Sequence, residues 1–183
     1  MKNSIYNTVF LLSVLGVLLP GCSDPIANYI KDLKSPDTGK RFEAAKALGE
    51  QGSNAAEAAP GLIEALDDPV AKVRHAAARS LGKIGPAGRD AIPDLTELLK
   101  DPDARVRHSA TITLGRFGPH SKDAVLNLIP LLEDKDPKNR QAAARTLGKV
   151  GADAAQAADA LRNTQKDADP QVREAATEAL KRI

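Results

Sequence analysis

Five leucines recur at one constant interval along the chain, and this interval constrains the fold more than any other feature. They are Leu48, Leu81, Leu114, Leu147 and Leu180, and five arginines keep the same interval: Arg41, Arg74, Arg107, Arg140 and Arg173. A strict period within the range of about 20–50 residues is typical of short units stacked into an elongated array, in which each unit buries its apolar face against its neighbours. We therefore expect an all-α solenoid of about five two-helix repeats rather than a globular enzyme core.

Each unit is expected to contain a first helix (A), a tight turn and a second helix (B). The A helices are predicted at residues 26–33, 55–66, 90–100, 122–133 and 153–164, and the B helices at residues 40–52, 73–85, 106–118, 139–151 and 172–183. The turns carry Asp-Pro at Asp68, Asp101, Asp136 and Asp169. Proline cannot continue helix A but can begin the next helix. Glycines are expected in a left-handed conformation at the ends of the B helices: Gly52, Gly85, Gly118 and Gly151.

The B helices share the pattern V-R-x-x-A-A-x-x-L-G-x-x-G, which resembles the HEAT-repeat superfamily, in particular the short HEAT-like repeats of phycobilisome lyases. The resemblance covers residues 25–183 and implies an α-solenoid, but the pattern carries no information about a particular activity. It also implies that each repeated arginine pairs with a turn aspartate and joins adjacent units, as arginine is the usual bidentate partner of a carboxylate. The alternative is a row of cations that binds an anionic ligand.

The N-terminus is predicted to be a separate segment. Lys2 is followed by an uncharged, mostly apolar run at residues 9–19, which is too short to span a membrane but suits a signal peptide. Leu19-Pro20-Gly21-Cys22 then resembles the cleavage site of bacterial lipoproteins, although Pro20 stands where Ala, Ser or Thr is usual. The resemblance implies a signal peptide at residues 1–21, a repeat domain at residues 22–183, and a lipid attached to Cys22. An ordinary secretory signal is the alternative.

Composition argues against several classes of function. The chain has 26 Lys and Arg against 24 Asp and Glu, and beyond the signal peptide its aromatic residues are Tyr29, Phe42 and Phe117. Near-neutral charge and scarce aromatic rings do not favour nucleic-acid binding. No cofactor is expected.

Two families of HEAT-repeat enzymes provide a test for catalysis. Deoxyhypusine hydroxylase holds two irons with His-Glu pairs after the repeated arginine, whereas this chain has the single histidines His75 and His108 there. We expect these histidines to be solvated, because a closed metal site usually needs three or four protein ligands. Bilin lyases resemble this chain only in the repeat. The sequence therefore predicts neither a catalytic residue nor a metal site.

The B helices are predicted to carry a basic stripe. Positions one, five and nine after the repeated arginine share one helical face, because steps of four residues stay on one side of a helix. In the family the B helices line the concave face, so we expect this stripe to bind a protein partner through Lys46, Arg79, Lys83, Arg116, Arg145 and Lys149. The A helices carry mostly acidic side chains, so two faces that serve only solubility are the alternative.

The leading hypothesis is a lipid-anchored scaffold of the bacterial cell envelope that binds an acidic protein segment. Ser23 follows the cysteine, where Asp acts as an inner-membrane retention signal in some bacteria, and this favours the outer membrane. The alternatives are a degenerate relative of the metal-dependent hydroxylases that uses His75 and His108, a relative of the bilin lyases, and a purely structural spacer.

Overall fold

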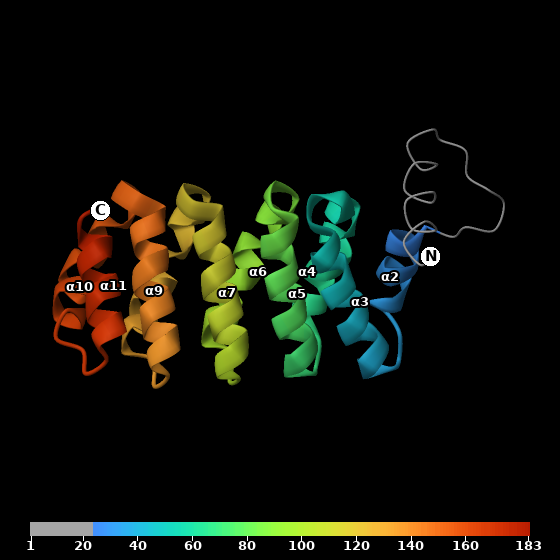
Figure 1. Ribbon diagram of the computed structural model, residues 1–183, viewed down its shortest axis with the longest axis horizontal. Helices are drawn as coiled ribbons and strands as arrows, with labels where there is room; N and C mark the ends of the chain where they lie inside the picture. Colours follow the sequence, from blue (N-terminus) through green and yellow to red (C-terminus); the bar gives the residue numbers. More distant parts are fainter. Residues whose placement is uncertain (1–23) are drawn as a thin grey trace, which may run out of the picture.

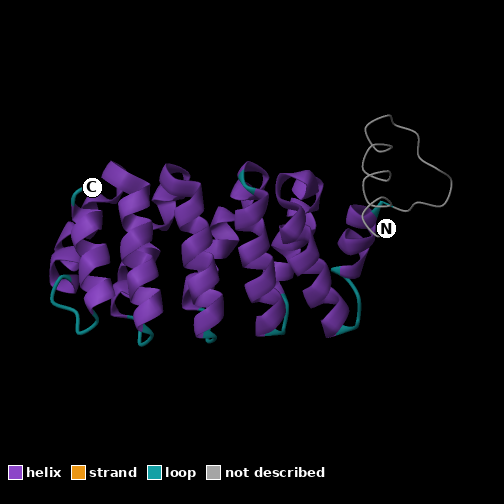
Figure 2. Cartoon of the chain, viewed as in Figure 1, coloured by secondary structure: helices purple, strands orange, loops and turns teal. Residues whose placement is uncertain are grey.

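The computed structural model describes residues 24–183 as a row of paired helices. Helices succeed one another along the row in chain order (Figure 1), and the described part of the chain contains no strand (Figure 2). The predicted all-α solenoid is confirmed. Within residues 24–183, no helix is long and apolar enough to cross a membrane.

The B helices form one layer of the row. They are α3 (Thr38–Gln51), α5 (Ala71–Ile84), α7 (Ala104–Phe117), α9 (Pro137–Val150) and α11 (Pro170–Leu180). An aspartate caps the start of α3, α7, α9 and α11 by accepting a backbone N–H bond in the first turn. α5 is the exception, because Val70 occupies the capping position and makes no such bond.

Glycine ends four of the B helices, as expected, but in a different conformation. Gly52, Gly85, Gly118 and Gly151 have φ between 56° and 84°. Their ψ values lie between −128° and −144°, far from the left-handed helical value. This mirror image of extended backbone is open essentially to glycine alone, so it explains the glycine at each of these four turns.

The A helices are less regular than the sequence predicts. The first is α2 (Pro25–Asp32). The next three combine a short α-helical turn with flanking 3-10 segments: η2 (Gly52–Ala58), α4 (Ala59–Glu64) and η3 (Ala65–Asp67); η4 (Pro86–Ala91), α6 (Ile92–Glu97) and η5 (Leu98–Lys100); η6 (Gly118–Ala124), α8 (Val125–Leu128) and η7 (Ile129–Glu133). The fifth is η8 (Gly151–Ala157) followed by α10 (Ala158–Thr164). Pro60, Pro93 and Pro130 lie within these A helices and lack the N–H that a continuous α-helix needs.

The core lies between the layers and runs the length of the array. Leu48, Leu81, Leu114 and Leu147 are fully buried, whereas Leu180 of the last unit is only partly buried. Each B helix packs against the next, from α3 on α5 to α9 on α11. The molecule is therefore held together by contacts between adjacent units.

Adjacent B helices approach closely at the first glycine of each Leu-Gly-x-x-Gly. A Cβ atom added to Gly82 would lie 2.8 Å from Thr113 Oγ1, and one added to Gly115 would lie 2.6 Å from Thr146 Oγ1. The same hydroxyls donate hydrogen bonds to backbone carbonyls of the preceding helix, from Thr113 to Ala78 at 2.8 Å and from Thr146 to Thr111 at 3.0 Å. Ser80 does the same to Ala45 at 2.7 Å.

The last B helix differs at the positions that would receive another helix. Lys181 stands where the other B helices carry this first glycine, and Glu174, Thr177 and Glu178 are exposed beside it. A polar outer face is typical of the terminal unit of a repeat array.

Candidate partner-binding face

Four of the five repeated arginines join adjacent units and are not free to bind a ligand. Each of four makes a two-pronged ion pair with an aspartate 27 residues further on: Arg41 with Asp68, Arg74 with Asp101, Arg107 with Asp134, and Arg140 with Asp167, all with Nε–Oδ2 distances of 2.6 to 2.7 Å. The same arginines donate through Nη1 to a backbone carbonyl six residues earlier. We call this series the arginine–aspartate ladder. It confirms the structural interpretation of the arginines.

Two of the expected aspartate partners are wrong. Asp136 and Asp169, which precede proline, cap α9 and α11 instead. The ladder uses Asp134 and Asp167, because these aspartates keep the separation of 27 residues from the arginine. In these two units the proline no longer follows the pairing aspartate directly. Within residues 24–183, Arg173 has no carboxylate partner and donates to the Asp167 and Ala168 carbonyls.

The ladder also lowers the pKa of three carboxylates, those of Asp68, Asp134 and Asp167. Burial opposes ionisation of Asp68 and Asp134, but hydrogen bonds from Arg41 and Arg107, with further backbone bonds, hold both pKa values below the usual range. The hydrogen bond from Arg140 lowers the pKa of Asp167. These aspartates are therefore ionised at neutral pH and belong to the framework of the fold.

The six cations predicted to bind a partner lie on one face of the B layer. All six side chains are exposed: Lys46 on α3, Arg79 and Lys83 on α5, Arg116 on α7, and Arg145 and Lys149 on α9. Lys46 lies 3.9 Å from Glu43, and the other five form no ion pair with any residue of the described part. The structure thus separates two sets of cations, one used in the ladder and one facing solvent.

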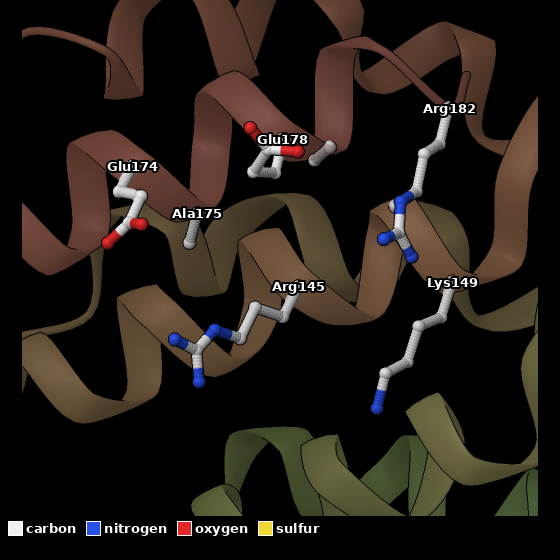
Figure 3. Close-up of a pocket in the computed structure, with 8 residues that line it drawn as sticks. Arg145, Lys149, Glu174, Ala175, Glu178 and Arg182 are labelled. Atoms are coloured by element: carbon white, nitrogen blue, oxygen red, sulfur yellow. The ribbon is translucent and has the colours of Figure 1, made fainter.

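Two shallow grooves run between B helices on this face. The groove between α3 and α5 measures about 250 Å³ and is lined by Phe42, Lys46, Glu50, His75, Ala76, Arg79, Ser80 and Lys83. The groove between α9 and α11 has a similar volume of about 250 Å³. Figure 3 shows Lys149 and Arg182 at one end of this second groove, with Arg145 and Glu174 towards the other. Small residues form the floors, since Gly148, Ala175 and Ala179 line the second groove.

The opposite layer carries more acidic side chains than the B face, where Glu50, Glu174 and Glu178 are exposed. Those of Glu57, Glu64, Asp67, Asp90, Glu97, Asp123, Glu133, Asp153 and Asp159 are exposed, and Asp94 is partly buried. The chain is therefore nearly neutral in total but has faces of opposite charge.

The histidines are less solvated than predicted. His75 is partly buried, and its Nδ1 lies 2.7 Å from Ser109 Oγ and 3.1 Å from the Arg105 carbonyl oxygen. His108 is also partly buried, and its Nδ1 finds no hydrogen-bond partner among residues 24–183, because Ala142 stands where Ser109 meets His75. His75 thus bridges α5 and α7. No group of three or more His, Cys, Asp or Glu side chains that could hold a metal occurs among residues 24–183.

Some of these features could not be assigned from sequence, and others lie beyond the structure. The serine and threonine hydroxyls between B helices were missed, although Ser80, Thr113 and Thr146 recur at the same interval as the leucines. Cys22 and residues 1–21, which are predicted to be a signal peptide, lie outside the described residues. Their assignment remains a prediction.

Comparison with known proteins agrees with the repeat architecture. The family model of HEAT repeats matches residues 23–115 and 92–181. No curated protein matches the chain.

Similar solved structures include an engineered protein with a TM-score of 0.75 and 25% identity, covering 86% of this chain and 78% of that one. The CpcE–CpcF complex of phycocyanin lyase from Nostoc sp. PCC7120 has a TM-score of 0.73 and 28% identity. That match covers 88% of this chain and 66% of the other. A designed armadillo repeat protein in complex with peptide (KR)4 has a TM-score of 0.75 and 18% identity, and the match covers 85% of this chain and 80% of that one. With the family model matching nearly all of residues 24–183, the chain belongs to the family of HEAT repeats.

Proposed function

We propose that this chain is a membrane-anchored interaction module that binds an acidic segment of a protein partner on its B-helix face. One observation carries the proposal: the B face presents exposed cations without ion-pair partners in residues 24–183, while the ladder arginines beside them are paired. An unpaired row of like charge attracts an oppositely charged partner at long range and speeds encounter.

The architecture supports this function. A HEAT- or armadillo-like solenoid is a scaffold suited to protein binding, because its stacked units present an extended continuous surface. The designed armadillo protein of the same fold is in complex with a basic peptide. The B face described above is itself basic, and an acidic ligand is its complement.

The proposed anchor is a lipid on Cys22, supported by the sequence around this cysteine. The protein would then sit at an envelope membrane, and Ser23 favours the outer one. We expect the Cys22→Ala variant to leave the membrane fraction or to remain unprocessed, because the thiol would carry the lipid. Labelled palmitate that still enters this variant would contradict lipidation at Cys22.

A non-enzymatic role is part of the proposal. His75 is hydrogen-bonded between two helices rather than oriented beside a second ligand, which supports a structural role for it. Metal analysis of the full chain purified without a histidine tag tests this point. Stoichiometric bound iron would instead support the hydroxylase alternative.

The binding face is tested with a charge-reversed triple variant of the full chain in mild non-ionic detergent. Arg79→Glu, Arg116→Glu and Arg145→Glu should abolish capture of the envelope partner without changing helicity. The matched control carries Arg89→Glu, Lys122→Glu and Lys138→Glu, which changes the net charge equally at exposed sites off the stripe.

Wild-type and control proteins should bind alike and lose the partner as salt reduces the screening length below about 8 Å. Equal capture by the triple variant would place the interface elsewhere on the molecule. Recovery of no partner by any of these proteins would favour the structural spacer.

A further inference from the structure

Four exposed cations form an unbroken row at the C-terminal ends of successive B helices. Each lies nine residues after the repeated arginine: Lys83 on α5, Arg116 on α7, Lys149 on α9 and Arg182 just beyond α11. We call these four the terminal row. The neighbouring row at position five is interrupted by Ile112 on α7 and by Glu178 on α11. The terminal row is therefore the longest regular series of charge on this face.

The cations of the terminal row are exposed, and one of them, Arg182, adds to the stronger effect of Lys181 in lowering the pKa of Glu178. None of the four forms an ion pair with any of residues 24–183. The stem of Arg116 lies over the preceding helix, because a Cβ atom added to Gly82 would be 3.1 Å from Arg116 Cδ. Helix C-termini favour nearby cations through the partial negative charge of their carbonyls, so the row is stable when no ligand is bound. Lys149 and Arg182 lie at the same end of their groove (Figure 3).

The B face offers little apolar surface to a ligand. Small residues and long charged side chains line its grooves, and Phe42 is the one large apolar residue among them. The exposed large hydrophobic side chain of residues 24–183, Leu126, lies on α8 in the other layer. An amphipathic helix binds by burying its apolar face in a hydrophobic groove, which is absent from the described B face. A ligand here must be recognised by charge, which favours an extended chain.

Resting on the proposed function, we propose that the terminal row binds an extended peptide segment with Asp or Glu at every third position. Packed helices lie about 8–10 Å apart. A polyproline II chain has about three residues per turn and rises about 3.1 Å per residue, so every third side chain faces the same way, roughly one helix-to-helix step further along. A segment lying across α5, α7, α9 and α11 thus presents one carboxylate to each cation.

The experiment uses fluorescein-labelled peptides of twelve residues with identical composition: four Glu, four Gly and four Ser. In the first peptide Glu occupies every third position, in the second every other position of the first eight, and in the third four consecutive positions. Binding to the full chain in mild detergent is followed by fluorescence anisotropy. We expect the first peptide to bind at least about fivefold more tightly, because only its spacing lets all four pairs form at once.

A pair of double variants connects this preference to the terminal row. Arg116→Glu with Lys149→Glu should weaken binding of the first peptide at least about tenfold, since two attractive pairs become repulsive. Lys122→Glu with Lys138→Glu is the control of equal charge and should stay within about twofold of the wild type. Circular dichroism of both variants checks that helicity is unchanged.

The outcomes separate this inference from the proposed function. Peptides that bind equally well whatever their spacing, and that all weaken in the terminal-row variant, would overturn the three-residue register but keep an acidic ligand on this face. Phosphatidylglycerol vesicles provide a further arm. Binding to the vesicles that depends on the terminal row, without binding of any peptide, would assign the row to a membrane surface and overturn the inference. Capture of the envelope partner by the triple variant would contradict the proposed function itself.

Discussion

Arg107 on α7 and Asp134, 27 residues further along the chain, form a two-pronged ion pair that joins one repeat to the next. Nε lies 2.7 Å from Oδ2 and Nη2 lies 3.1 Å from Oδ1. The side chains are only 17% and 7% exposed, so water screens this pair much less than a surface ion pair. Asp134 also accepts the Asp136 backbone N–H, while its own carbonyl accepts a bond from Arg140. One residue thus receives hydrogen bonds from two successive ladder arginines.

Replacing Asp134 with Ala should destabilise the fold by about 2–3 kcal/mol, because Arg107 is left partly buried without its counter-ion. Asp136→Ala is the matched control two residues away and should cost about 1 kcal/mol, the usual value for a lost helix cap. Urea unfolding monitored by circular dichroism measures both. A larger loss of stability in Asp136→Ala than in Asp134→Ala would indicate that Asp136, which precedes proline, is the partner of Arg107.

Stability should fall in acid. The folded-state pKa values of Asp68, Asp134 and Asp167 lie below their ordinary values, so the unfolded chain binds protons more readily than the folded one. The resulting stabilisation is fully present above the unfolded pKa of about 3.9 and is lost as pH decreases through the folded values. The urea midpoint should thus be nearly constant from neutral pH to about pH 5 and decrease steeply below about pH 4. The decrease should be smaller in Asp134→Asn, and an equal slope in that variant would contradict this account.

Gly148→Ala should destabilise the protein even though alanine favours helices. A Cβ atom at this position would lie 2.8 Å from Ala179 Cα, which belongs to the backbone of α11 and cannot move aside locally. We expect a net loss of roughly 1–3 kcal/mol from overpacking. Gly61→Ala is the control, since its Cβ would meet only the flexible tip of Leu33 at 3.0 Å, and it should be close to neutral. A stabilised Gly148→Ala variant would show that α9 and α11 are packed less closely.

Leu114→Ala should destabilise more than Leu180→Ala. Leu114 is fully buried between units on both sides, whereas Leu180 of the last described unit is only partly buried. A truncated leucine in a closed core costs about 2–5 kcal/mol, and the cost is smaller where the site can relax. Thermal unfolding of the two variants should give clearly different midpoints. Equal shifts would be inconsistent with a stacked array.

Asn139→Val should increase stability by about 1 kcal/mol. Asn139 is fully buried, and its Oδ1 has no partner in the described part of the chain. Valine stands at the equivalent position in three other B helices, as Val73, Val106 and Val172. The Asn139 amide does donate to the Ala104 carbonyl at 3.2 Å and to the carboxylate of Asp134. However, the Ala104 oxygen lies in the first turn of α7, and Asp134 keeps its bonds from Arg107 and from the Asp136 N–H. A stability below that of the wild type would show that this bond outweighs the unpaired oxygen.

The sequence predicts the repeat architecture because residues that this architecture requires recur at a fixed interval. The core leucines and the positive-φ glycines recur at one shared interval, and this periodicity placed all five B helices. The partners of Arg107 and Arg140 were mistaken because aspartates such as Asp134 and Asp136 lie close together in the turns, and only the three-dimensional register separates a pairing carboxylate from a helix cap. The contact of His75 with Ser109 could not be predicted either, because it depends on how deeply α7 packs on α5.

The separation of the cations into two sets has a consequence for how such a protein can change. Arg74 fixes the frame through the turn aspartate Asp101, while Arg79 and Lys83 on the same helix contribute nothing to that connection. Exposed charges can therefore be exchanged one helix at a time without rebuilding the scaffold. A solenoid of this kind can acquire a new ligand through point substitutions on its surface, while the joints between its units are inherited unaltered.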